Sequence, residues 1–424
     1  MIDISTWLLV ITTVVFSIWI LRSQSIFSFL GFTVGIFFIF VLPKTFLYHL
    51  YGNTVFLAQN VNFTPLHVNS ALIVILLFIL GIVISYTLPI GWLTTFTKKI
   101  ASSSLQIQKE IKVSDTISLY IIFPLFFISF VAYIWAIYKV DGHIFHKTTF
   151  TYNGEISPAY IMLKIVQVIK ISFYLYFIQL ISIKEKIPMN SKKILILAIL
   201  FTIAIFLVAG HRSGIIILFL QIVLFSKYMG WIKNKHIIWA IIALVGLNIF
   251  ILFFRESTEN TQYQIINFLR RYFFEIEKIS GLIMEDNLGQ LITSPWMSLI
   301  DTSSQIHFTG SSHHYLGNHI LQSKSAVGPT ILGDIIIYLG SAFVFPLALL
   351  LGYIMRIIEK ITFSSSNGLI VAIGITAISI GEFLLLNTDT WAFIKRFIFE
   401  SGLIFMAYML LKIKFPNPFK SKIS

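Results

Sequence analysis

The 424-residue chain contains no cysteine, so disulfides, thiolate nucleophiles and cysteine-ligated zinc are excluded. Charged residues are scarce at 12%, about half the share found in a soluble domain. Acidic residues number 18 against 31 basic ones, and no Asp-x-Asp or Glu-x-Asp pair occurs. A metal-dependent sugar transferase would need such a pair, so the sequence predicts chemistry with no metal ion and no other cofactor.

Long apolar runs recur throughout the chain, and 57% of the residues are hydrophobic. The runs are continuous and helix-length, which is typical of transmembrane helices and not of transmembrane strands. The sequence therefore predicts an all-α, polytopic membrane protein with about 11 transmembrane helices, in the range of roughly 10–12. The predicted spans are Ser5–Leu21, Ile26–Val41, Ser70–Leu93, Asp115–Tyr138, Ala159–Ile183, Ile194–Ala209, Gly214–Phe225, Ile237–Phe254, Thr330–Met355, Leu369–Leu386 and Trp391–Leu411.

The distribution of positive charge predicts an orientation. With the N-terminus outside, the inner connections hold 18 lysines and arginines, whereas the short outer loops and helix ends hold 6. This bias places the C-terminus inside. The net charge of +13 then fits inner loops that touch anionic membrane lipid rather than a nucleic-acid partner. No cleavable signal segment is expected, because the first apolar run leads directly into a second.

The spans divide the chain into three parts: N-terminal helices in residues 1–254, a large outer loop in 255–328, and C-terminal helices in 329–424. Apolar residues in the first half of the loop recur every three or four positions and predict an amphipathic helix that lies on the membrane surface. They are Ile265, Leu269, Tyr272, Ile276, Ile279 and Ile283. The second half is rich in serine, glycine and histidine and is predicted to be coil.

The segment Gly210–Gly214 (GHRSG) lies between two apolar runs, at a predicted outer turn. Lys193 and Lys227 bound 33 residues, so each flanking helix has about 17 residues, or about 25 Å of length. The hydrocarbon core is ~30 Å thick, so we expect the turn to lie slightly below the headgroups. Arg212 would then point into a recess, with His211 beside it. The alternative is an interfacial arginine that snorkels to the surface.

Further cations on the outer side would surround Arg212. They are Arg255, Arg270, Arg271, Lys395 and Arg396. Guanidinium groups remain charged and bind phosphates in a bidentate manner, so such a cluster suits a lipid diphosphate. For Lys395 and Arg396, snorkelling is the alternative interpretation.

Lys164, Gln167 and Lys170 form a polar strip along the fifth predicted span. Lys170 lies near mid-depth, where a charged side chain is a candidate functional residue. It would contact the substrate or, alternatively, form a structural pair with Glu382, Glu400 or another carboxylate.

The coil of the outer loop contains four histidines, His307, His313, His314 and His319. They are candidates for a metal site, for a general base, or for ordinary solvent-facing side chains. Asp334, just inside the ninth span, would orient an acceptor hydroxyl or pair with an arginine. The predicted outer loop Pro43–Asn69 holds tyrosine and amide side chains that suit sugar binding or an aromatic belt. They are Tyr48, Tyr51, Asn53, Gln59, Asn60 and Asn62.

Three of these features together resemble the bacterial oligosaccharide repeat-unit polymerases (Wzy-type O-antigen and polysaccharide polymerases). VAGHRSGIII is similar to the Gly-x-Arg-Ser-Gly turn of that family, and Arg255 in FFRES opens the long outer loop. GPTILGDIIIYLGSAFVFPLALLLG is similar to the glycine- and acid-containing start of the following span.

The resemblance implies the helical membrane glycosyltransferase fold that these polymerases share with O-antigen ligases. The protein would lie in the bacterial inner membrane with its active site facing the periplasm. A growing chain on undecaprenyl diphosphate would be transferred to the next lipid-linked repeat unit, without metal or nucleotide sugar. A chain-length regulator protein would be a partner. Arg212 and Arg255 would stabilise the departing diphosphate.

One segment departs from the superfamily pattern. Ligases carry a His-Asn pair just before the ninth span, where this chain reads Val327-Gly328-Pro329-Thr330. A histidine base would therefore come from the loop, and His313 and His314 are the candidates. The missing pair counts against an O-antigen ligase. A flippase for the same lipid-linked unit should show balanced halves and charges across both leaflets, which this chain lacks.

Overall fold

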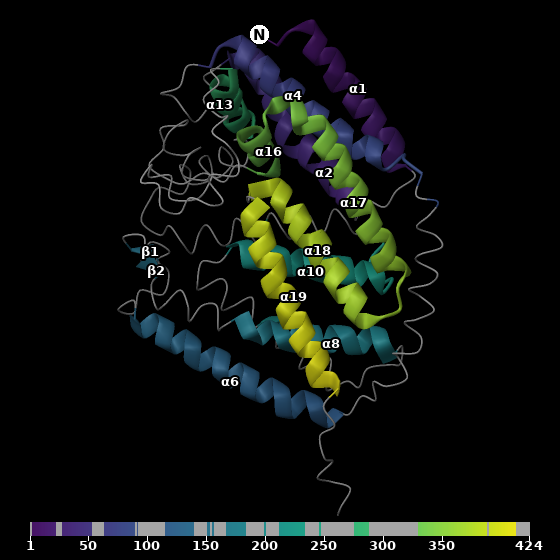
Figure 1. Ribbon diagram of the computed structural model, residues 1–424, viewed down its shortest axis with the longest axis vertical. Helices are drawn as coiled ribbons and strands as arrows, with labels where there is room; N and C mark the ends of the chain where they lie inside the picture. Colours follow the sequence, from purple (N-terminus) through teal and green to yellow (C-terminus); the bar gives the residue numbers. More distant parts are fainter. Residues whose placement is uncertain are drawn as a thin grey trace, which may run out of the picture. The chain divides into compact units, whose positions relative to one another are not determined.

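The structure is a computed structural model of the whole chain and describes most, but not all, of its residues. The described residues are 2–22, 28–52, 63–89, 91, 115–139, 151–152, 155–156, 167–183, 199–200, 212–233, 246, 275–287, 330–387 and 390–412. Apart from short turns and residues at helix ends, this part of the chain is helical, with one antiparallel pair of two-residue strands, β1 (Thr151–Tyr152) and β2 (Glu155–Ile156). The predicted helical fold class is confirmed (Figure 1).

The helices follow one another along the chain in this order: α1 (Ile4–Leu21), α2 (Phe29–Ile36), the π-helical turn η1 (Phe37–Val41), α3 (Leu42–Tyr51), α4 (Pro65–Ser85), α6 (Asp115–Lys139), the 3₁₀ turn η4 (Gln167–Ile169), α8 (Lys170–Ile183), α10 (Arg212–Tyr228), α13 (Glu275–Asn287), α16 (Ile331–Leu339), the 3₁₀ turn η7 (Ser341–Phe343), α17 (Val344–Ser364), α18 (Gly368–Asn387) and α19 (Thr390–Lys412). Three stretches of the described chain are long and apolar enough to cross a membrane: Phe29–Tyr51, Pro65–Ser85 and Ser341–Ser364.

Two sequence-based span predictions need correction. The expected single helix Thr330–Met355 is interrupted at Gly340, whose φ of 87° ends α16 after 9 residues. Only glycine adopts that backbone conformation without strain. The helix therefore ends at this glycine, although the sequence is apolar on both sides of it. The expected outer loop Pro43–Asn69 begins instead with helix α3, in which Tyr48 is buried and therefore cannot contact a sugar. Asn53, Gln59, Asn60 and Asn62 lie outside the described residues.

The π-helical turn η1 has a local cause in the sequence. Pro43 follows it, has no N–H to donate, and would press its ring against the carbonyl one turn earlier in a regular α-helix. The N–H of Leu42 instead donates to the carbonyl of Phe37, five residues back. This wider turn lets α2, η1 and α3 continue as one helical stretch through the proline.

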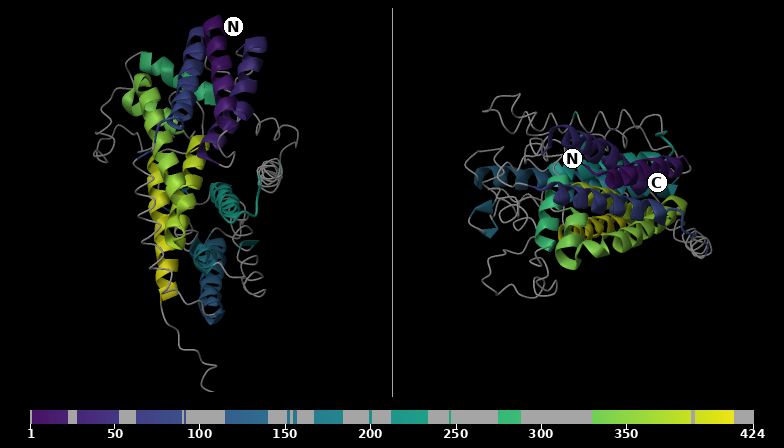
Figure 2. Two further views of the ribbon diagram at one scale, coloured as in Figure 1. Left: turned by 90° about the vertical axis from the view of Figure 1, so that its right-hand side faces the viewer. Right: turned by 90° about the horizontal axis from the view of Figure 1, so that it is seen from above.

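The chain forms two compact units. The first contains Met1–Ile90, Glu259–Glu359 and Ile380–Arg396, and the second contains Gly91–Thr258, Lys360–Ser379 and Phe397–Ser424. In the first unit α1, α2 and α4 pack together, and α4 also packs against α13 (Figures 1 and 2). Helix α4 is apolar around its circumference, which is the pattern of a helix enclosed by others.

Small residues bring α4 and α17 into close contact within the first unit. Gly81 and Ser85 are four residues apart on α4, and Ala348 and Gly352 are four apart on α17. A Cβ added at Gly81 would lie 2.8 Å from the Cβ of Ala348, and one added at Gly352 would collide with the Ser85 hydroxyl. Paired small residues at this spacing are typical of tightly packed helices in membranes.

Charged side chains of α17 satisfy the ends of two other helices. Arg356 Nη1 donates to the carbonyls of Ser85 (3.1 Å) and Leu88 (2.6 Å), at the C-terminal end of α4. Glu359 accepts the N–H of Phe29 at the start of α2, and also the hydroxyl of Tyr86 (3.0 Å). A cation at a helix C-terminus and an anion at a helix N-terminus both complement the helix dipoles.

The helix predicted in the outer loop is present as α13, and the predicted stripe residues Ile276, Ile279 and Ile283 are buried on it. Its buried face packs against α4 and α16, and its expected location on the membrane surface stays a prediction. Its Glu277 is fully buried and forms an ion pair with Lys44 of α3. The other predicted stripe residues lie outside the described part.

Candidate functional site

The central candidate residue, Arg212, is the first residue of α10 in the second unit. Helix α10 has 17 residues, the length that the sequence predicted for this half of the hairpin. Its first backbone N–H groups have no partner within the helix, so the start of α10 is favourable to an anion. Gly214 lies inside the first turn of the helix and is buried, rather than in the turn that precedes it.

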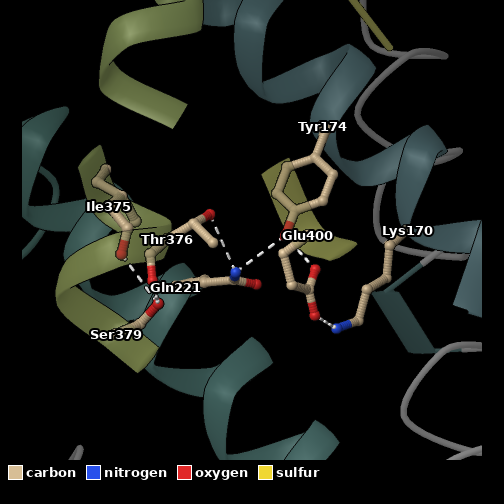
Figure 3. A network of polar contacts seen from close by, with 7 residues as sticks. All are labelled: Lys170, Tyr174, Gln221, Ile375, Thr376, Ser379 and Glu400. Carbon is tan, nitrogen blue, oxygen red and sulfur yellow. Dashed lines mark hydrogen bonds and ion pairs between the residues drawn. The ribbon is translucent and has the colours of Figure 1, made fainter. Parts of the chain in front are cut away.

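A network of polar side chains lies in the second unit and includes Lys170, the first residue of α8. Lys170 forms an ion pair with Glu400 of α19, and both side chains are fully buried. The Tyr174 hydroxyl donates to the second carboxylate oxygen of Glu400 at 2.7 Å. Gln221 of α10 donates through Nε2 to the Tyr174 hydroxyl (2.9 Å) and to Thr376 Oγ1 of α18 (3.2 Å). Figure 3 shows Lys170 and Tyr174 both directed toward Glu400, and Gln221 lying between Tyr174 and Thr376.

The ion pair decides between the two interpretations of Lys170. The sequence left open a substrate contact and a structural pair with Glu382, Glu400 or another carboxylate, and Glu400 is the partner. The Lys170 ammonium group is fully buried, and the Glu400 carboxylate balances its charge inside the protein. We therefore assign Lys170 to the internal network rather than to direct contact with a substrate.

The remaining predicted site residues fall into two groups. Asp334, Lys395 and Arg396 belong to the first unit: Asp334 is buried in α16, Lys395 is exposed on α19, and Arg396 is half-buried. The others lie outside the described residues. They are His211, Arg255, Arg270, Arg271, His313 and His314. The assembly of Arg212 with these cations therefore stays a prediction.

Sequence reasoning missed Tyr174, Gln221 and Thr376. One signal was available, because Tyr174 follows Lys170 by four residues and therefore shares its helix face. Gln221 and Thr376 come from two other helices, and no local pattern links them. Among the described residues no group of three histidine, aspartate or glutamate side chains gathers as metal ligands would. No protein-family model, curated protein or solved structure matches this chain.

Proposed function

We propose that this chain is a multi-pass glycosyltransferase of the bacterial inner membrane that polymerises oligosaccharide repeat units carried on undecaprenyl diphosphate. The observation that carries the proposal is Arg212, set in the GHRSG segment at the first residue of an apolar helix. The guanidinium and the free N–H groups of the helix start both attract a phosphate. The reaction takes place at the periplasmic face.

Exposed apolar side chains support a location in the membrane. On α1 they recur at Ile4, Leu8, Ile11, Val15 and Ile18, spaced four or three residues apart, and Ile4 is 80% exposed. This spacing forms one stripe along the helix, and lipid is the solvent that such a stripe fits. The close contact of α4 and α17 through small residues supports the same location.

In the proposed reaction, a hydroxyl of the incoming unit attacks the anomeric carbon of the growing chain. The bond from that carbon to the diphosphate oxygen breaks, and undecaprenyl diphosphate leaves with the bonding electron pair. Arg212 stabilises this developing negative charge, and losing one such contact costs roughly 3 kcal/mol, or about a hundredfold in rate. The hydroxyl proton passes to a base, for which His313 and His314 are candidates. No metal is required, because a cationic side chain holds the leaving group.

The proposal is tested with Arg212→Ala in a strain that lacks the chromosomal copy. We expect long surface polysaccharide to disappear while single repeat units still accumulate on the lipid carrier, with Arg212→Lys intermediate. Arg22→Ala, at the predicted inner end of α1, is the matched control and should leave the ladder of chain lengths unchanged. A normal ladder from Arg212→Ala at normal protein level, or activity of the purified protein that EDTA abolishes and Mg²⁺ restores, would overturn the proposal.

A further inference from the structure

Helix α10 connects Arg212 with the buried polar network through nine residues of continuous helix. Gln221 lies nine residues after Arg212, about 13.5 Å further along the helix axis at ~1.5 Å per residue. Any rotation or axial shift of α10 at Gln221 is therefore transmitted to its first residue. The position of Arg212 depends on what fixes α10 at its centre.

Between Arg212 and Leu224, the apolar contacts of α10 fix its depth and rotation only weakly. Up to Leu224 its buried apolar side chains are aliphatic and include Ile216, Ile217, Leu218 and Leu220. More directional packing follows in the last turn, where Phe225 packs on Phe177 and the Tyr228 hydroxyl donates to the Ser365 carbonyl. Aliphatic packing is non-directional, and an adjacent register offers similar side chains to the same neighbours. In a membrane, where lipid is as apolar as these residues, the preference for one register is weaker still.

The two hydrogen bonds of Gln221 are directional contacts in the middle of α10, between Arg212 and the last turn. One goes to Tyr174 of α8 and the other to Thr376 of α18, so α10 is attached at one level to two other helices. Tyr174 is in turn held by Glu400, which is held by Lys170. Hydrogen bonds to an ionised partner are about twice as strong as neutral ones. The contacts to Glu400 are therefore the strongest in the network.

The network does not maximise stability. Gln221 Oε1 is buried and has no hydrogen-bond partner among the described residues, which costs about 1–3 kcal/mol. A buried ion pair such as Lys170–Glu400 is often replaceable by apolar residues without loss of stability. The best-attested role of such buried polar groups is to specify one register among several.

We infer that Lys170, Glu400, Tyr174, Gln221 and Thr376 form a positioning network that sets the axial register of α10 and thereby the place of Arg212. The inference rests on the proposed function for its link to catalysis. A displacement of about 1 Å in a group that contacts the reacting centre costs on the order of a hundredfold in rate. We therefore expect loss of the Gln221 bonds to lower kcat/KM for the lipid-linked donor by about a hundredfold.

The register itself is measured without reference to activity. Because the chain has no cysteine, Ser213→Cys at the start of α10 and Met409→Cys on the exposed side of α19 accept spin labels at two defined sites. The distance distribution between them, measured by pulsed electron resonance on the full chain in lipid, should broaden or shift in Gln221→Leu. The matched control is Leu218→Ala, equally buried on the same helix, which should leave the distribution unchanged.

Thr376→Val and Tyr174→Phe each remove one of the two hydroxyl groups that accept a hydrogen bond from Gln221. If Gln221→Leu does not fold, the same distance measurement is made on these two variants. An unchanged distribution in these variants overturns the inference. A changed distribution with unchanged kcat/KM, normalised to folded protein, also overturns it, because the network then does not act through Arg212. If the unmodified protein shows no polymerisation, the proposed function fails, and the distance distribution alone decides whether the network sets the register.

Discussion

At the scale of single residues, the second unit contains a buried lysine and a buried glutamate, and each charge is stable in the interior only because the other is present. Lys170 and Glu400 are both at zero exposure, where an isolated charge would be very costly. The sequence alone named Glu400 as one possible partner, beside Glu382 or another carboxylate. It gave no means to choose between Glu400 and Glu382, since that choice depends on which helices are neighbours.

We expect Glu400→Leu to lower the free energy of unfolding by about 3–5 kcal/mol, because it leaves Lys170 buried without a counter-charge. The double variant Lys170→Met/Glu400→Leu should recover most of that loss, since no charge then remains inside. Thermal unfolding in detergent, followed by fluorescence in a double-mutant cycle, measures the coupling. Additive losses in the double variant would show that the pair is not a unit.

A second residue-scale prediction concerns Asp3, the N-cap of α1, whose carboxylate accepts the N–H of Thr6 at 2.8 Å. Hydrogen bonding from Thr6 lowers the pKa of Asp3 below its usual value. The stability that Asp3 contributes is therefore fully present above about pH 3.9, its unfolded pKa, and is lost as the pH falls through the lowered folded pKa. Hydrogen exchange in the first turn of α1 should accelerate over that range. Asp3→Asn, which keeps the cap, should abolish the pH dependence.

At the scale of elements, the sequence predicted some helices closely and others badly, for identifiable reasons. Helices α1, α18 and α19 begin and end within one residue of their predicted spans, because each apolar run stops at polar or charged residues. The break at Gly340 was missed because hydropathy is continuous across it. The partners of α13 were not predicted, because an apolar stripe fits protein as well as lipid, and the pairing of its buried Glu277 with Lys44 depends on the folded unit.

The close contact between α4 and α17 is tested by a substitution at Gly352. Gly352→Ala should destabilise the first unit, because the new methyl group collides with the Ser85 hydroxyl between two close backbones. Gly402→Ala on α19 is the matched control, since nothing lies within 4 Å of a Cβ added there. That control should be neutral or stabilising by up to about 1 kcal/mol. Equal unfolding temperatures for the two variants, measured side by side, would contradict the assigned contact.

At the scale of the whole molecule, the two compact units are not successive segments of the chain. Each is assembled from three segments, and α17, α18 and α19 are each divided between the units. The sequence reasoning divided the chain by position instead, into helices, loop and helices. It could not find the units, because the packing of α13 on α4 joins residues about two hundred positions apart.

The proposed orientation predicts a labelling pattern for the whole chain. Asn53→Cys, on the predicted outer side, should react with a membrane-impermeant maleimide in intact spheroplasts. Ser421→Cys, near the predicted inner C-terminus, should react only after the membrane is opened. The unmodified chain is the negative control, since it has no cysteine to react with the maleimide. Labelling of Ser421→Cys in intact spheroplasts would reverse the orientation and remove Arg212 from the periplasmic face.

The break at Gly340 has a consequence for how the chain is accommodated by a bilayer. Without it, residues 331–364 would form a single rod about 51 Å long, far more than a ~30 Å hydrocarbon layer can cover. Such hydrophobic mismatch forces steep tilting or local thickening of the lipid. A positive-φ glycine that separates nine residues from the rest leaves a stretch of about 36 Å, from Ser341 to Ser364, which spans the layer with much less tilt than the unbroken rod would need. Gly340→Ala should therefore make the protein sensitive to acyl-chain length in the surrounding lipid.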